Sequence, residues 1–156
     1  MKLICVGKIK EKYLNDAIDE YKKRLSKYTK LDIVELPDIS YNEIDKVKKE
    51  EGKLILKHLK ETDNVIILDI NGQELSSVEL TNKLCRLESI NSNITFIIGG
   101  SYGLSEEVKK RANFSLSFSK LTFPHQLFRV ILLEQIYRTY KIRNNENYHK
   151  LKIHMM

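Results

Sequence analysis

The sequence has no run of about 18 or more apolar residues and no apolar export segment near its start. Nothing therefore indicates secretion or a membrane partner, and we expect a cytoplasmic protein. Cysteine is scarce, because Cys5 and Cys85 are the only two, and they form neither a CxxC motif nor a Cys/His cluster. We interpret both as core residues and expect no metal site.

The motifs of several common catalytic sites are also missing. The glycine-rich segment GGSYG, residues 99–103, is not a GxGxxG fingerprint, and no Walker lysine follows it. The sequence has no G-x-S-x-G elbow and no metal-ligand spacing. Hydrolase and metalloenzyme functions are therefore disfavoured, and a domain that senses a nucleotide is a weak alternative.

Apolar strands alternate with amphipathic helices along the chain. The expected strands are 3–6, 31–36, 65–68, 94–98 and 114–118, and the expected helices are 13–28, 42–60, one from Ser76, one from Ser105 and 125–143. Ser76 and Glu79 have capping-box spacing, and Asn71-Gly72 is expected to turn the chain. The pattern predicts an α/β fold with a mostly parallel sheet of about five strands, in a single domain spanning residues 1–156.

Positive charge is concentrated in the last third of the chain. Residues 109–156 contain ten lysines and arginines against Glu134 and Glu146, a net charge of +8, whereas the rest of the chain has −2. This asymmetry indicates a polyanionic partner, with nucleic acid favoured over a membrane surface. A basic surface that serves only solubility is an equally good explanation of the charge alone.

The helix expected at 125–143 is apolar around most of its circumference, with Arg129, Arg138, Lys141 and Arg143 on the remainder. Its apolar members are Phe128, Val130, Ile131, Leu132, Leu133, Ile136, Tyr137, Tyr140 and Ile142. One sheet would not bury all of them, so we expect a second contact surface and a two-fold homodimer. Leu132 and Ile136 are the positions at which we expect glutamate to disrupt this dimer.

In parallel sheets, ligands bind beyond the carboxyl ends of the strands. In this sequence those ends are Leu68–Gly72, Gly99–Gly103 and Phe118–Phe123. They offer backbone amides and carbonyls, small residues and apolar walls. Such a site suits a neutral aromatic ring with hydrogen-bonding edges, such as adenine.

Four segments together resemble one known family. The segments VIILDINGQELSS, FIIGGSYGL, SLSFSKLTFPHQLFRVILLEQIYR and NYHK look like the ribosomal RNA large subunit methyltransferase H family, of the SPOUT superfamily of knotted methyltransferases. The likeness spans essentially the whole chain. It implies a C-terminal trefoil knot, a homodimer, S-adenosylmethionine as methyl donor, and N3 of a pseudouridine in 23S ribosomal RNA as acceptor. The implied substrate is the assembled ribosome, because the chain has no added RNA-binding module.

The resemblance also implies which residues contact the cofactor. These are Leu68, Gly99, Phe118, Ser119, Lys120, Leu121, Thr122 and Phe123. The physical arguments above add Gly100, Gly103 and His125 to the expected site. Two residues of the expected site have simpler explanations. Lys120 is equally consistent with a solvated loop cation, and His125 more readily caps the last helix than titrates.

Methyl transfer from a sulfonium depends mainly on alignment, but the acceptor N3–H must also lose its proton. We expect Arg138 to stabilise the resulting anion, and Tyr148 and His149 to position the base or relay the proton, across the dimer interface. Arg138 also fits an ion pair with Glu134, and Tyr148 and His149 fit a packed tail.

Residues 144–156 are expected to be loosely held, with Leu151–Met156 extending beyond the usual end of the family. If this tail folds over the RNA entrance as a lid, we expect its added residues to alter the lid. The alternative to an enzyme is a non-catalytic RNA-binding or ribosome-associated module whose glycine loops are only tight turns.

Overall fold

The structure is a computed structural model that describes residues 1–150. Its centre is a five-stranded sheet in the order β2-β1-β4-β3-β5, and all neighbouring strands are parallel. The strands are β1 (Lys2–Val6), β2 (Asp32–Leu36), β3 (Asn64–Glu74), β4 (Ile94–Ile98) and β5 (Phe114–Ser117). The prediction of a parallel α/β sheet is confirmed, and β2 lies at an edge as its polar residues indicate.

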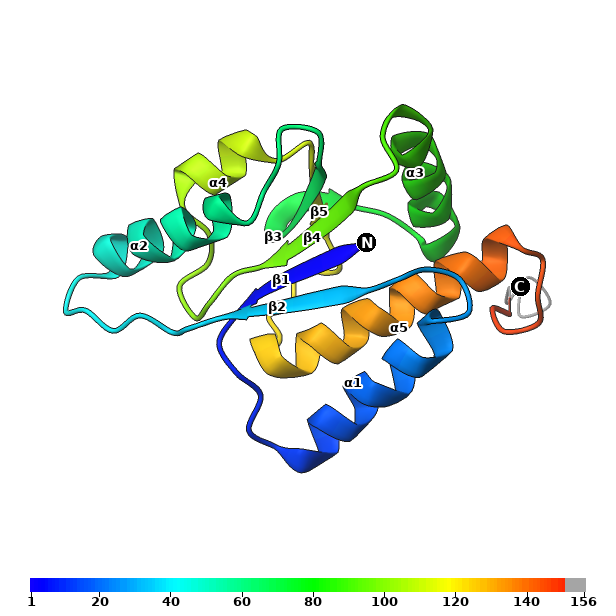
Figure 1. The fold of residues 1–156 in the computed structure, drawn as a ribbon, viewed down its shortest axis with the longest axis horizontal. Helices are drawn as coiled ribbons and strands as arrows, with labels where there is room; N and C mark the ends of the chain where they lie inside the picture. Colours follow the sequence, from blue (N-terminus) through cyan, green and yellow to red (C-terminus); the bar gives the residue numbers. More distant parts are fainter. Residues whose placement is uncertain (151–156) are drawn as a thin grey trace.

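Five helices cover the two faces of this sheet (Figure 1). They are α1 (Lys12–Leu25), α2 (Ile44–Lys57), α3 (Ser77–Ile90), α4 (Glu106–Arg111) and α5 (His125–Arg143). Side chains of α1, α3 and α5 share one apolar core, and those of α2 and α4 share the other. The central strand β4 is buried at all five positions, as expected for a strand covered on both faces.

Local signals fix two of the helix starts. Ser76 accepts a hydrogen bond from the Glu79 amide, and the Glu79 carboxylate accepts one from the Ser76 amide, which forms the predicted capping box of α3. Ser105 caps α4 in the same manner by accepting from the Val108 amide. Because α4 follows the glycine-rich segment directly, its cap also fixes where that segment ends.

The turn predicted at Asn71-Gly72 is wrong. Strand β3 continues to Glu74, and its pairing with β5 shifts register between Leu68 and Gln73. A Cβ on Gly72 would lie 2.8 Å from the Ser115 carbonyl carbon. The glycine is therefore required for close approach of two backbones inside an irregular strand, rather than for a turn.

Helix α5 buries more of its apolar surface within one chain than the sequence analysis expects. Leu132 and Ile136 are both 0% exposed and belong to the core shared with α1 and α3. The expectation that these two residues form the dimer contact is wrong. The large apolar residue left exposed on α5 is Leu127, in its first turn.

The basic residues of α5 are paired rather than free. Arg129, expected on the helix surface, is 1% exposed, and its Nη1 lies 2.6 Å from Glu35 Oε2. Three further cations of α5 pair with carboxylates, as Arg138–Glu134, Lys141–Glu146 and Arg143–Glu88. Much of the positive charge that the sequence places on this helix is therefore neutralised within the chain.

The two cysteines have different environments. Cys5 in β1 is buried, and burial raises the pKa of its thiol to about 12, as expected for a core residue. Cys85 in α3 is exposed, so its assignment to the core is wrong. Within residues 1–150, no helix is both long and apolar enough to span a bilayer.

Candidate functional site

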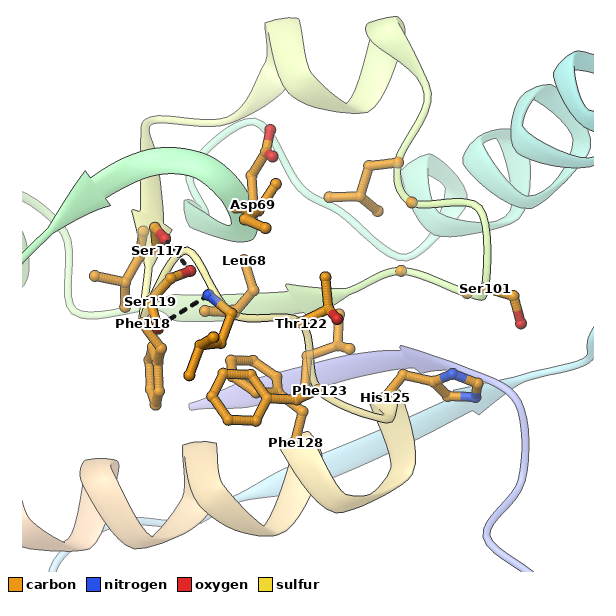
Figure 2. Close-up of a pocket in the computed structure, with 18 residues that line it drawn as sticks. Leu68, Asp69, Ser101, Ser117, Phe118, Ser119, Thr122, Phe123, His125 and Phe128 are labelled. Carbon is orange, nitrogen blue, oxygen red and sulfur yellow. Dashed lines mark hydrogen bonds between the residues drawn. The ribbon is translucent and has the colours of Figure 1, made fainter.

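A cleft of about 360 Å³ opens at the register shift within β3 and at the carboxyl ends of β4 and β5 (Figure 2). It is lined by Leu68, Asp69 and Ile70 from β3, by the segment 98–104 after β4 except Tyr102, and by residues from the segment 116–128. The three strand ends chosen from the sequence therefore meet at one site. Their common direction explains this, because parallel strands present all their carboxyl ends at one edge.

The glycine loop, residues 99–103, forms one side of the cleft. Gly103 has a φ of 85°, which side chains other than glycine rarely adopt. A Cβ on Gly99 would lie 2.9 Å from Leu104 Cδ2 and 3.1 Å from the Gly103 carbonyl carbon. The loop thus folds tightly on itself, with the Gly103 amide donating to the Gly100 carbonyl at 3.1 Å.

The opposite side is the segment between β5 and α5. The Ser117 hydroxyl donates to the Ser119 carbonyl at 3.1 Å, and the Leu121 amide donates to Ser119 Oγ at 3.0 Å. These bonds curl the segment so that the Phe123 ring faces Phe128, with 5.6 Å between ring centroids (Figure 2). The result is a shaped apolar wall with exposed backbone groups.

Ten of the eleven residues expected at the cofactor site line this cleft. They are Leu68, Gly99, Gly100, Gly103, Phe118, Ser119, Leu121, Thr122, Phe123 and His125. Lys120 is exposed and is not among the lining residues, in keeping with the solvated-cation alternative. His125 is the first residue of α5, and the N-cap position is occupied by Pro124, which makes no side-chain capping bond.

Asp69 is the carboxylate among the described lining residues, and it was not among the residues expected at this site. None of the described lining residues is a lysine or an arginine. Asp69 Oδ1 accepts from the Asn71 amide at 3.1 Å, and Oδ2 lies 3.7 Å from Lys109 Nζ. An acidic residue directly after a buried strand is the signal that could have identified it.

The three residues expected to act on the acceptor, Arg138, Tyr148 and His149, form a second cluster, organised by Glu134. Glu134 Oε1 accepts from Arg138 Nε at 3.0 Å and from the Tyr148 hydroxyl at 3.1 Å. Arg138 Nη1 lies 3.0 Å from His149 Nδ1, and the guanidinium carbon lies 4.8 Å from the centroid of the Tyr148 ring. The ion pair of Arg138 with Glu134 is therefore present, and Arg138 also contacts the tail; its role toward the acceptor stays a prediction.

The protonation of this cluster limits its chemistry. Burial, together with the charge of Glu134, raises the pKa of Tyr148 to about 12, so its hydroxyl is a donor at neutral pH. Because a guanidinium can only donate, His149 Nδ1 must accept from Arg138, and the ring hydrogen lies on Nε2. The cluster therefore offers the His149 Nε2–H as a donor, while the Glu134 carboxylate offsets the charge of Arg138.

Residues 144–150 are tied to the fold, although the sequence analysis expects a loosely held tail. The Tyr28 hydroxyl donates to Glu146 Oε1 at 2.8 Å, and Lys141 Nζ donates to Oε2 at 3.1 Å. Tyr148 packs edge-on against Tyr137, with ring centroids 4.9 Å apart. The extension Leu151–Met156 lies outside the described residues.

The cleft and the cluster are separated along α5. Phe128 lines the cleft, and Arg138 follows it by ten residues. At about 1.5 Å of rise per residue, this spacing corresponds to roughly 15 Å along the helix axis. Methyl transfer requires donor and acceptor in contact, so the two groups of one chain do not complete a single site.

A parallel sheet with an apolar, glycine-bordered cleft at its carboxyl edge defines a small-molecule-binding α/β protein. Comparison with known families makes the class specific, because a family model described as "Predicted SPOUT methyltransferase" matches residues 1–149. The chain therefore belongs to the SPOUT methyltransferase family, and it is a methyltransferase.

Named relatives match nearly the full length of the chain. A protein of Clostridium botulinum (strain 657 / Type Ba4), named ribosomal RNA large subunit methyltransferase H, is 56% identical over 95% of this chain and 98% of its own length. Ribosomal RNA large subunit methyltransferase H 1 of Clostridium perfringens (strain SM101 / Type A) is 55% identical over the same shares. These similarities confirm the family that the sequence motifs indicate.

Proposed function

We propose that this protein uses S-adenosylmethionine to methylate N3 of a pseudouridine in 23S ribosomal RNA, on the assembled ribosome in the cytoplasm. The names of the relatives support ribosomal RNA as the substrate. The motifs quoted above support the pseudouridine and the cofactor. We expect one domain over residues 1–156, the trefoil knot of the superfamily, and a homodimer.

The charge pattern of the cleft is the observation that carries this proposal. Its described lining contains one carboxylate, Asp69, and no lysine or arginine. A polyphosphate requires cationic partners, whereas a sulfonium and an ammonium group are favoured by a carboxylate. The apolar walls and the backbone groups of the glycine loop fit an adenosine moiety. The residues present therefore fit S-adenosylmethionine better than ATP.

When bound, this cofactor supplies an electrophilic methyl group. The chain's own residues hold it in the cleft and exclude water with the apolar wall around Phe123. At the acceptor base, the Arg138 guanidinium stabilises the anion left when N3 loses its proton. His149 Nε2–H, a donor in this arrangement, orients a carbonyl group of the base. The Tyr148 hydroxyl donates to Glu134 Oε1 and so helps to position the cluster.

The separation of cleft and cluster supports a site shared between two protomers. Each protomer would contribute its cleft to one site and its Arg138 cluster to the other, as a two-fold axis permits. Exposed apolar residues beside the cleft, Leu121, Phe123 and Leu127, offer a contact surface for this dimer.

Titration calorimetry with S-adenosylmethionine, S-adenosylhomocysteine and ATP tests the cofactor. We expect binding of the first two only. Labelled methyl should then reach ribosomes from a strain that lacks the modification, and an isolated hairpin should be a poor substrate. Absence of S-adenosylmethionine binding would contradict the proposed use of this cofactor and favour a ribosome-associated module. Equal activity on the isolated hairpin would contradict the requirement for an assembled ribosome.

Mixed dimers test the shared site. One inactive variant carries Gly99→Val, which blocks the cleft, and the other carries Arg138→Ala. If the site is shared, random mixing gives half heterodimers, each with one intact site, and restores about a quarter of wild-type activity. If cleft and cluster act within one protomer, the mixture stays inactive.

A further inference from the structure

Glu51 in α2 is a buried carboxyl that the site described above does not use. It is 5% exposed, and its Oε1 has no hydrogen-bond partner among residues 1–150. Burial raises the pKa of this carboxyl, the backbone of Ile39 opposes the rise, and Asp38 adds to it. A buried polar atom without a partner destabilises a fold, so its position calls for an explanation.

The carboxyl lies directly behind the glycine loop. A Cβ built on Gly100 would lie 2.9 Å from Glu51 Oε1 and 3.1 Å from Oε2. A larger residue at position 100 would require the Glu51 carboxyl to shift. Gly100 lines the cleft and Glu51 does not. The loop is therefore bounded by the carboxyl on one side and by the cleft on the other.

The next residue of α2 contacts the other end of the same segment. A Cβ on Gly52 would lie 2.3 Å from Ser105 Oγ. That hydroxyl caps α4 by accepting from the Val108 amide at 3.3 Å. Between the two contacts, Leu104 is buried and lines the cleft. Glu51 and Gly52 thus lie close to both ends of residues 100–105.

From this packing we propose that Glu51 is a positioning residue of the cleft, whose carboxyl supports Gly100 and so sets the shape of the glycine loop against the bound ligand. The ligand itself, S-adenosylmethionine, rests on the proposed function. Glu51 does not touch the ligand and acts only through Gly100. Retention of a buried carboxyl with one oxygen unpartnered follows from this role, because sites are often shaped at some cost to stability.

Reciprocal rescue between two substitutions tests the contact. Glu51→Ala removes the support, and Gly100→Ala pushes the loop away from the carboxyl, so each should weaken S-adenosylmethionine binding by about tenfold in calorimetry. The double variant Glu51→Ala/Gly100→Ala should bind more tightly than either single one, because the added methyl occupies the vacated space. Additive losses would overturn the proposal.

Gly103→Ala is the matched control. A Cβ there meets no atom within 4 Å, but the φ of 85° strains any other residue. Its loss of affinity therefore has a different cause, and Glu51→Ala should not relieve it. Rescue of Gly103→Ala as well would show that Glu51→Ala merely loosens the loop.

Amide spectra of the ligand-free protein make the test independent of the cofactor. In Glu51→Ala, the largest ¹H–¹⁵N shift changes outside α2 are expected at residues 99–103. Changes confined to α2 would overturn the proposal even if Gly100→Ala did not fold. If the wild type binds no S-adenosylmethionine, the proposed function fails, while these spectra still decide the role of Glu51.

Discussion

Arg138 Nη1 and His149 Nδ1 lie 3.0 Å apart, which joins the middle of α5 to a tail residue eleven positions later. The contact fixes the imidazole tautomer, because the guanidinium can only donate. His149 is therefore unable to use Nδ1 as a base in this arrangement. A water molecule, rather than the Tyr148 hydroxyl with its pKa of about 12, is our expected first acceptor of the N3 proton.

Arg138→Lys tests whether the fork of the guanidinium is required. A lysine keeps the charge but cannot bridge Glu134 and His149 together. We expect kcat to fall by about 100-fold, with the affinity for S-adenosylmethionine unchanged. Arg143→Lys is the control, since Arg143 lies on the same helix and pairs with Glu88 at 2.8 Å. Equal losses in both variants would contradict a specific role for Arg138.

Glu146→Ala tests the attachment of the tail. Hydrogen bonds from Tyr28 and Lys141 lower the pKa of Glu146 below 4.5. Its stabilising effect is therefore present above pH 4.5 and is lost as the pH falls through the lowered value. Removing the carboxylate should reduce kcat about tenfold through misplacement of Tyr148, and should speed proteolysis of the tail at pH 7.

Glu20→Ala is the control for this prediction, because Glu20 forms an exposed pair with Arg24 at 2.8 Å. Such pairs contribute little. Glu146→Ala with full activity would show that attachment of the tail is dispensable.

Much of the fold follows from local pattern. The apolar run of β4, the capping box of Ser76 and the bounds of α5 are all set by neighbouring residues, and sequence reasoning identified them. The cleft residues followed because strand direction alone brings Leu68, Gly99 and Phe118 to one edge.

The missed features depend on partners that are distant in sequence. Gly72 is required by the backbone of Ser115, and Arg129 is buried because Glu35, ninety-four residues away, pairs with it. The proposed role of Glu51 likewise depends on its closeness to Gly100, forty-nine residues away. No periodicity or spacing within one segment encodes such contacts.

Leu127→Glu tests the dimer surface on a residue that the protomer core does not use. Leu127 is 41% exposed and lies outside the cleft lining. A buried glutamate without a partner disfavours association, so we expect monomers by light scattering and loss of methyl transfer. Ile90→Glu, on α3 at a residue 81% exposed, is the control and should remain dimeric. A fully active Leu127→Glu monomer would exclude the shared site.

Asp69→Asn tests the charge of the cleft. The amide keeps an oxygen for the Asn71 amide but removes the negative charge, and it leaves Glu106 as the carboxylate partner of Lys109. We expect affinity for S-adenosylmethionine to fall by about tenfold, and affinity for S-adenosylhomocysteine, which has a neutral sulfur, to fall less. Asp45→Asn, on the first turn of α2, should change neither affinity. Equal losses for both ligands would place Asp69 away from the sulfonium.

Glu51→Gln measures what the buried carboxyl costs the fold. Its pKa is raised above the unfolded value of 4.5, so the protonated form stabilises the protein below pH 4.5, and this contribution is lost as the pH rises through the folded pKa. Relative to wild type, Glu51→Gln should therefore gain stability between pH 4 and pH 8, by on the order of 1 kcal/mol. Glu50→Gln, whose carboxylate pairs with Lys53 at 3.1 Å, should show no such gain. Denaturant unfolding at pH 4 and pH 8 gives the stability of each variant relative to wild type. A gain for Glu51→Gln that is equal at the two pH values would assign the effect to packing instead of charge.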